Sequence, residues 1–181
     1  MLQLYPKALA LLCLFAMAAA AATLEKLTTE EMTQKATLIV RGRVSNCSGQ
    51  MRGPVIYTAC NVAVTERWKG AAGAAVQVWI PGGAAQGLVQ TFTGTPKFTN
   101  GDEYVLFLWS GRSGLNQVIG LSQGVFDLTP TAAGQVTAKR AASAERMLNS
   151  AGQEIRDEAV ELRVSELKAQ VRRALAAGSR P

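Results

Sequence analysis

The sequence contains one pattern that is typical of a catalytic serine. Gly120-Leu-Ser-Gln-Gly124 matches the G-x-S-x-G nucleophile elbow, which needs a strand before it and a helix after it. The residues that follow, Val125 to Leu128, are typical of a strand, and the chain has no histidine to act as base for Ser122. A Ser–Lys pair is formally possible, but the sequence places no lysine nearby. We predict a tight turn between two strands.

A glycine-rich segment, Pro81-Gly-Gly-Ala-Ala-Gln-Gly87, bears a loose likeness to a phosphate-binding loop. It lacks the Gly-Lys-Ser/Thr ending and leads into a strand instead of a helix N-terminus, so a nucleotide site is disfavoured. A mobile surface loop that contacts a partner is the better interpretation. The candidate contact residues are Gly82, Gly83 and Gln86, with Trp79 beside them.

Acidic pairs could suggest acid–base chemistry. Glu30-Glu31 and Asp102-Glu103 lie at a predicted helix start and a predicted turn, where solvated carboxylates are common. Without histidine, and without a cluster of other ligand types, we predict no metal site and no cofactor.

The first 22 residues have the features of a signal peptide. Lys7 supplies the positive region, Ala8 to Met17 the apolar region, and Ala20-Ala-Ala22 a small-residue cleavage site before Thr23. A retained anchor is the alternative, although the apolar run is shorter than the about 20 residues of a membrane span. We therefore expect a periplasmic or secreted protein.

Two of the three cysteines remain after cleavage, and both lie in a predicted hairpin. If the turn centres between Gly53 and Pro54, facing residues have numbers that sum to 107, which pairs Cys47 with Cys60. An oxidising compartment favours a disulfide between them. A reactive or metal-binding pair is the alternative.

The hairpin is predicted from a period of two in residues 37–68. Leu38, Val40 and Val44 share one face of the first arm, and Arg41 and Arg43 share the other. The second arm runs over 56–68, and residues 48–54 have the composition of a turn.

Further strands are predicted over 75–80, 88–92, 104–109, 117–121 and 125–128. The 104–109 run is continuously apolar, so we expect a central strand covered on both sides. We expect Trp109 in the core, Trp68 at its rim on the face of Val62, and Trp79 on the face opposite Val78, exposed or covered by the C-terminal helix.

The predicted fold is mainly β: a small OB-like antiparallel barrel over 23–130, with a helix over 29–35 started by the Thr28-x-x-Glu31 capping box. Residues 131–181 form a C-terminal extension. It has a possible strand at 136–138, a possible helix at 141–150 and an amphipathic helix over 165–176, with Ser165 as a cap. Residues 155–164 are helix or strand, and we prefer helix over 156–162.

Several segments together resemble exported bacterial proteins of unassigned function, whose opening hairpin is similar to that of netrin-like and tissue-metalloproteinase-inhibitor-like domains. The resemblance implies an OB-type five-stranded barrel and protein binding. Those inhibitors chelate the target's zinc with an N-terminal cysteine, whereas cleavage here leaves Thr23 or an alanine, so the inhibitory residues do not carry over. The matching segments are Ala36-Thr-Leu-Ile-Val-Arg-Gly-Arg-Val44, Val64-x-x-x-Trp-Lys-Gly70, Pro81-Gly-Gly83, Gly101-Asp-Glu-Tyr-Val-Leu-Phe-Leu108 and Gly120-x-x-Gln-Gly-x-Phe126.

These observations favour an exported, non-catalytic module that binds another protein of the envelope or outside it. The net charge of +6 is spread thinly along the chain. It permits, without favouring, a second function: binding of an anionic glycan or single-stranded nucleic acid on the barrel face. A hydrolase is the remote third reading.

Overall fold

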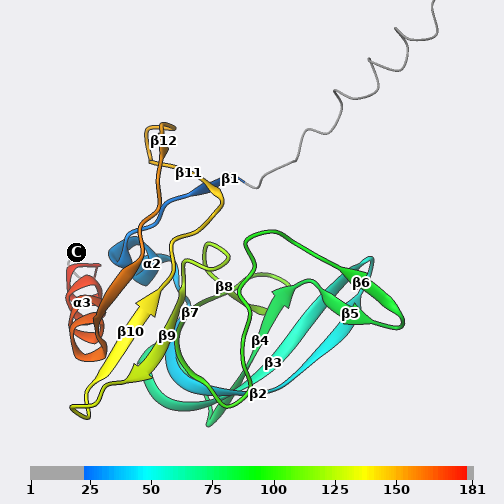
Figure 1. The fold of residues 1–181 in the computed structure, drawn as a ribbon, viewed down its shortest axis with the longest axis horizontal. Helices are drawn as coiled ribbons and strands as arrows, with labels where there is room; N and C mark the ends of the chain where they lie inside the picture. Colours follow the sequence, from blue (N-terminus) through cyan, green and yellow to red (C-terminus); the bar gives the residue numbers. More distant parts are fainter. Residues whose placement is uncertain (1–22, 179–181) are drawn as a thin grey trace, which may run out of the picture.

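The structure is a computed structural model, and it describes residues 23–178. The predicted signal peptide lies outside these residues. The described chain is mainly β, with one short and one longer helix (Figure 1). Its elements are β1 (Thr23–Glu25), α2 (Thr29–Lys35), β2 (Leu38–Arg52), β3 (Val55–Lys69), β4 (Ala75–Pro81), β5 (Gly83–Ala85), β6 (Leu88–Gln90), β7 (Glu103–Ser110), β8 (Asn116–Val118), β9 (Val125–Pro130), β10 (Val136–Arg140), β11 (Arg146–Leu148), β12 (Glu154–Ile155), β13 (Val160–Arg163) and α3 (Val164–Gly178).

The hairpin of β2 and β3 is the longest element pair. Its turn is the two residues Gly53 and Pro54, as predicted, and the outer pairs from Arg52↔Val55 to Ser48↔Ala59 follow the expected register. The disulfide between Cys47 and Cys60 is present. The prediction of a turn over 48–54 is wrong, because a two-residue turn with Gly53 at positive φ lets both strands continue to its edge.

Five strands close into a ring. In the sheet, β2 pairs with β3, β3 with β4, β4 with β8, β8 with β7, and β7 again with β2. The predicted sheet was antiparallel throughout, but β4 and β8 are parallel, through the single pair Val78↔Asn116. Buried side chains fill the interior of the ring, among them Val40, Val62, Val78 and Leu106. The alternation seen in the sequence therefore sets this inner face.

The sheet continues beyond the ring. Strands β9, β10 and β13 extend it from β7, so residues on both sides of position 130 share one sheet. The predicted barrel ended at residue 130, and the strand predicted beyond it at 136–138 is present as part of β10.

The predicted helix over 141–150 is wrong, because this segment contains β11. Of the two alternatives for residues 155–164, the preferred helix over 156–162 is wrong: β13 begins at Val160 and pairs with β10. Strand pairing determines the structure of both segments: β11 pairs with β1 and β12 in a small separate sheet, and β13 joins the large sheet through β10. Such pairing with distant residues cannot be inferred from local composition.

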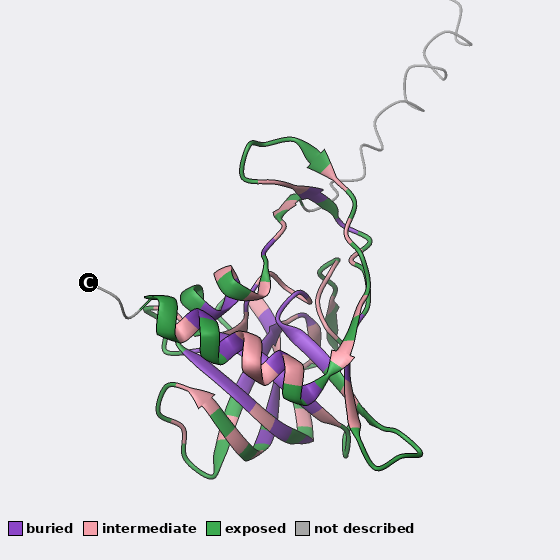
Figure 2. Ribbon diagram, turned by 90° about the vertical axis from the view of Figure 1, so that its left-hand side faces the viewer, coloured by how far each residue is buried: buried purple, intermediate pink, exposed green. Residues whose placement is uncertain are grey.

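Both helices cover the outer face of this sheet (Figures 1 and 2). Helix α2 begins with the predicted capping box of Thr28 and Glu31. Helix α3 begins at Val164, one residue before the predicted cap Ser165. Under the helices lies a second core, which contains Ile39, Val105, Phe107, Phe126, Met32, Leu167 and Val171.

Charged groups attach α3 to the sheet and link its central strands β2, β3 and β7. Glu66 on β3 accepts hydrogen bonds from Lys168 on α3, from Trp68 Nε1 at 3.1 Å and from Arg41 at 3.0 Å. These bonds, that of Lys168 foremost, outweigh burial and lower the pKa of Glu66 to about 2. Arg41 also binds Glu103 through two hydrogen bonds of 2.9 Å. The side of the sheet under α3 is thus closed by packing and by ion pairs.

Trp68 belongs to this outer face, whereas the sequence placed it with Val62. The register of β2 and β3 shifts at Thr65, where Arg41 pairs with Glu66 but Gly42 pairs with Val64. One extra residue in a strand moves every later side chain to the opposite face. Trp68 consequently packs against the core beneath the helices.

Within residues 23–178 no helix combines the length and the apolar character that crossing a membrane requires.

Candidate functional site

Two adjoining pockets lie beside β4. The first, here called the tryptophan pocket, has a volume of about 580 Å³, and the second, the disulfide pocket, about 430 Å³. They share Ile80, Pro81 and Pro96, so they form one continuous surface. The tryptophan pocket is also lined by Lys35, Trp79, Trp109, Val118, Ile119 and Leu121. The disulfide pocket is also lined by Cys47, Cys60, Gly82, Val89, Phe92 and Lys97.

Trp109 forms an exposed wall of the tryptophan pocket, although the sequence predicted it in the core. It is 48% exposed, while Phe107 on the same face of β7 is fully buried. The difference arises because the helical cover ends before Trp109. The indole lies against Gly111, where an added Cβ would come within 2.5 Å of Cη2. Gly111 therefore leaves room for the ring and fixes one side of it.

The predicted loop over 81–87 is partly a strand. Residues 83–85 form β5, which pairs with β6 around the turn residues Gln86 and Gly87. The strand expected over 88–92 is present only over residues 88–90, as β6. Three large apolar side chains of this region are exposed: Leu88 by 57%, Val89 by 78% and Phe92 by 38%. Together with Trp109 they are the exposed large hydrophobic side chains of the described chain, and Val89 and Phe92 line the disulfide pocket.

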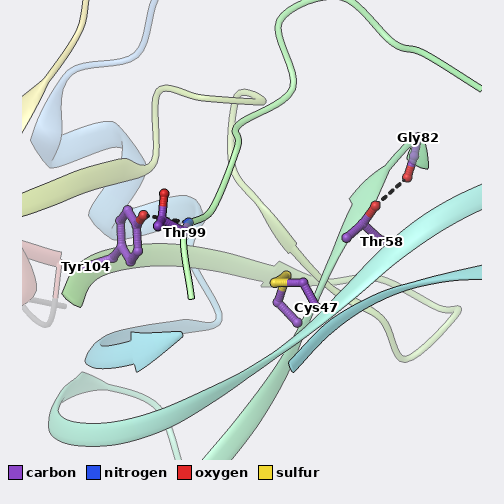
Figure 3. The surroundings of a disulfide bond; sticks show 6 residues. Cys47, Thr58, Gly82, Thr99 and Tyr104 are labelled. Carbon is purple, nitrogen blue, oxygen red and sulfur yellow. Dashed lines mark hydrogen bonds between the residues drawn. A yellow bond between two sulfur atoms is a disulfide. The ribbon is translucent and has the colours of Figure 1, made fainter. Parts of the chain in front are cut away.

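Short polar contacts shape the disulfide pocket (Figure 3). The Thr58 hydroxyl donates to the Gly82 carbonyl at 2.8 Å, which holds the end of β4 over β3. The backbone N–H of Thr99 donates to the hydroxyl of buried Tyr104 at 3.0 Å, which fixes the loop that carries Lys97. Cys47 and Cys60 line the pocket between these two fastenings. Cys60 is fully buried and Cys47 is partly exposed, so a ligand would meet the cross-link on the side of Cys47.

The structure brings most of the predicted contact residues to this surface. Trp79 lines the tryptophan pocket but is 5% exposed. It lies on the face opposite Val78, as predicted. Its cover is Tyr57, at 6.3 Å between ring centroids, and Arg52, at 4.1 Å from the ring, not the C-terminal helix.

The glycines of the predicted set lie at the second pocket. Gly82 and Gly83 line the disulfide pocket, and both have positive φ, which β-carbon-bearing residues rarely adopt. Gln86 is exposed at the tip of the β5–β6 hairpin. Sequence reasoning did not select Trp109, Val89 or Phe92 as contact residues. Trp109 lies at the end of the continuous apolar run of β7, which predicts burial. For Val89 and Phe92, the sequence alone does not show whether an apolar side chain in or beside a short strand is exposed.

The Gly120–Gly124 segment is a turn between β8 and β9, as expected, and no helix follows it. Gln123, which belongs to this segment, is buried, and its side chain joins two backbone groups of the N-terminal segment. The Gln123 side chain accepts from the Leu27 N–H and donates to the Glu25 carbonyl, both at 2.9 Å. The segment therefore has a structural use that does not involve Ser122.

The charged side chains that line the two pockets are of one sign. Lys35 and Lys97 line them, and neither lining of the described residues includes a carboxylate. Lys35 pairs with Glu25 at 3.1 Å, where both side chains are half exposed, so this pair is weak and open to competition. Among residues 23–178 there is no group of three or more potential ligands that could hold a metal ion.

Comparison with protein-family models, with curated proteins and with solved structures found no match to this chain.

Proposed function

We propose that this protein is an exported, non-catalytic module that binds another protein through the surface formed by the tryptophan and disulfide pockets. The observation that supports it is that three exposed apolar side chains line two adjoining pockets, Trp109 the first and Val89 and Phe92 the second. Exposed apolar surface of this kind costs solubility, and large patches commonly mark interaction sites. The disulfide fits an oxidising compartment outside the cytoplasm.

The same proposal includes the fold assignment that the resemblance implies. The closed ring of β2, β3, β4, β8 and β7 supports an OB-type barrel, although the additional strands β9, β10 and β13 and the parallel β4–β8 pair depart from an antiparallel barrel. Fold alone does not settle function, so the proposal depends on the surface.

Affinity capture with matched variants tests this function. The mature protein with its disulfide intact is used as bait on envelope and culture-fluid extracts, beside Trp109→Ala, Phe92→Ala and the control Arg172→Ala on an exposed part of α3. A partner retained by the wild type and the control but lost with both pocket variants supports the proposal. Equal recovery with all four baits contradicts it.

Gly111→Ala provides a sharper test because it keeps the indole but displaces it. The new Cβ would lie 2.5 Å from the ring, so Trp109 must move. We expect partner recovery to fall as it does for Trp109→Ala. Unchanged recovery would show that the position of this ring is irrelevant.

Anionic glycan or single-stranded nucleic acid binding is the second candidate, favoured by the exposed Trp109 beside Lys35. Bases and sugars stack on exposed indoles, and polyanion binding weakens steeply as salt rises. Fluorescence titration with heparin and with oligothymidylate at two salt concentrations distinguishes this function from an apolar protein interface.

A further inference from the structure

Strand β6 has an unpartnered edge next to the disulfide pocket. It pairs with β5 on one side, and within the described chain no strand pairs with its other side. The pairs Gly83↔Gln90, Ala84↔Val89 and Ala85↔Leu88 follow a two-residue turn. In such a hairpin the pair beside the turn, Ala85↔Leu88, is a hydrogen-bonded pair, and the next pair, Ala84↔Val89, is a non-hydrogen-bonded pair. The N–H and C=O of Val89 therefore point away from β5.

This edge contains no lysine, proline or bulge, and its length of three residues is its one protection against pairing. Proteins commonly place a lysine, a proline or a bulge on such an edge, because it otherwise recruits other strands. The three residues of β6 are Leu-Val-Gln, and Val89 is 78% exposed. The edge is therefore both apolar and available for pairing.

The hairpin that carries this edge is held firmly. The Gly82 N–H donates to the Ile56 carbonyl at 2.8 Å, and the Ile56 N–H donates to the Gln90 side chain at 2.7 Å. At Gly49, an added Cβ would lie 1.8 Å from the Ala84 carbonyl oxygen, so β5 crosses β2 in direct backbone contact. A partner would meet a strand already in position, which lowers the entropic cost of association.

The positive charges that line the pockets indicate which partner segments would bind. Lys97 is exposed, and Lys35 pairs weakly with Glu25, while neither pocket lining contains a carboxylate. A segment with a carboxylate beside its apolar side chains would meet complementary charge, and a basic segment would be repelled.

We propose that the partner presents an extended segment that pairs with β6 as an added strand, with alternate apolar side chains directed at the two pockets and a carboxylate near Lys97. Added strands gain affinity from main-chain hydrogen bonds and specificity from pockets for every second side chain. This inference rests on the proposed function and specifies how the same surface recognises its partner.

Selection of random peptides displayed on phage, with the intact oxidised protein as target, tests the mode of binding. We expect enriched peptides to have apolar residues at every second position and at least one Asp or Glu. An enriched peptide is then synthesised with and without methyl groups on alternate backbone nitrogens. We expect the methylated form that blocks the bonding edge to bind about tenfold more weakly, as the loss of about one or two hydrogen bonds implies.

Two pairs of variants complete the test. Val89→Pro removes the outward N–H of β6 and breaks no hydrogen bond to β5. Val89→Thr keeps this N–H. We expect the peptide to bind about tenfold more weakly to Val89→Pro than to Val89→Thr. Lys97→Glu should weaken binding severalfold and Lys97→Arg should not. The methylated peptide gives the same information should Val89→Pro fail to fold.

The outcomes separate the inference from the function on which it rests. Enriched peptides that are basic, have helical spacing or tolerate methylation overturn strand addition, while a partner lost with Trp109→Ala keeps the proposed function. Failure to enrich peptides, together with saturable quenching of tryptophan fluorescence by laurate, overturns the inference in favour of an anionic amphiphile. Failure in both capture and selection ends both proposals.

Discussion

The outer face of the sheet is buried under helices in one half and exposed to solvent in the other. Under α2 and α3, the side chains of Val105 and Phe107 are fully buried and join a core with both helices. Two residues further along β7, on the same face, Trp109 is 48% exposed beside the tryptophan pocket. In Figure 1 the helices and the β5–β6 hairpin lie at opposite ends of the molecule. We call the part of the molecule under α2 and α3 the covered half, and the part that carries Trp109, the two pockets and the β5–β6 hairpin the open half.

The two halves are also stabilised by different means. The covered half depends on side-chain packing and on ion pairs such as that of Glu66 with Lys168. The open half has the disulfide and backbone contacts between β5 and the β2–β3 hairpin. A surface fixed by a cross-link can keep apolar side chains exposed without needing to bury them for stability. This difference is the physical basis for placing the binding surface in the open half.

The largest expected effect is in the covered half. Phe107→Ala removes a fully buried ring that packs against Phe126 at 5.8 Å between centroids. We expect a loss of about 3–5 kcal/mol in the free energy of unfolding, measured by urea titration. A loss below about 1 kcal/mol would mean that the covered half is loosely packed, and the comparison would fail.

Loss of the disulfide should rank next. The bond closes a loop with a sequence separation of 13, so Cys47→Ser with Cys60→Ala should reduce the free energy of unfolding by about 3 kcal/mol in the chain-entropy model. We further expect peptide binding to fall in the folded double variant, since both cysteines line the pocket. Wild-type protein in reductant provides the matched control. Unchanged stability would show that the open half does not need its cross-link.

Acid should loosen the covered half. The folded pKa of Glu66 is about 2, below its unfolded value near 4.5, so its contribution is present above about pH 4.5 and is lost as the pH falls toward 2. With allowance for solvent screening, we expect about 1–2 kcal/mol in urea titrations across this range. Glu66→Gln should flatten this part of the pH profile. If the variant and the wild type had the same dependence of unfolding free energy on pH, Glu66 would not be the group responsible.

The smallest expected change in stability is that of Trp109→Ala. Because about half of the residue is already in solvent, we expect the free energy of unfolding to fall by only about 1 kcal/mol. The same variant should abolish partner recovery. A large destabilisation would instead make Trp109 a structural residue and weaken the contrast with Phe107.

Local patterns predicted the parts of the fold that depend on neighbouring residues. The period of two and the turn at Gly53 were sufficient for the hairpin and for the pairing of Cys47 with Cys60. The capping spacing likewise predicted α2. Features set by distant contacts were missed: a single extra residue at Thr65 reversed the face of Trp68, and pairing with β10 made a strand of 160–163.

The candidate site was predicted only in part. Gly82, Gly83 and Trp79 were selected because a glycine-rich segment follows an outward tryptophan, and all three line the pockets. Trp109 was missed because an apolar run shows that a strand is buried but not where its cover ends. The extent of a neighbouring helix determines that boundary: α2, which packs on β7, ends at Lys35, and Lys35 and Trp109 line the same pocket.

The ring of strands is closed by few backbone contacts where β8 meets β4. A single residue pair, Val78↔Asn116, links β8 to β4, reinforced by the Asn116 side chain, which donates to the Gln77 carbonyl at 3.1 Å. Sparse bonding of this kind lets a strand separate from its neighbour without global unfolding. Gln117 and Val118 line the tryptophan pocket, so each such opening would widen that pocket and let it accept side chains of different size. Amide hydrogens of β8 should accordingly exchange with deuterium sooner than those of β7, and a bound peptide should slow them.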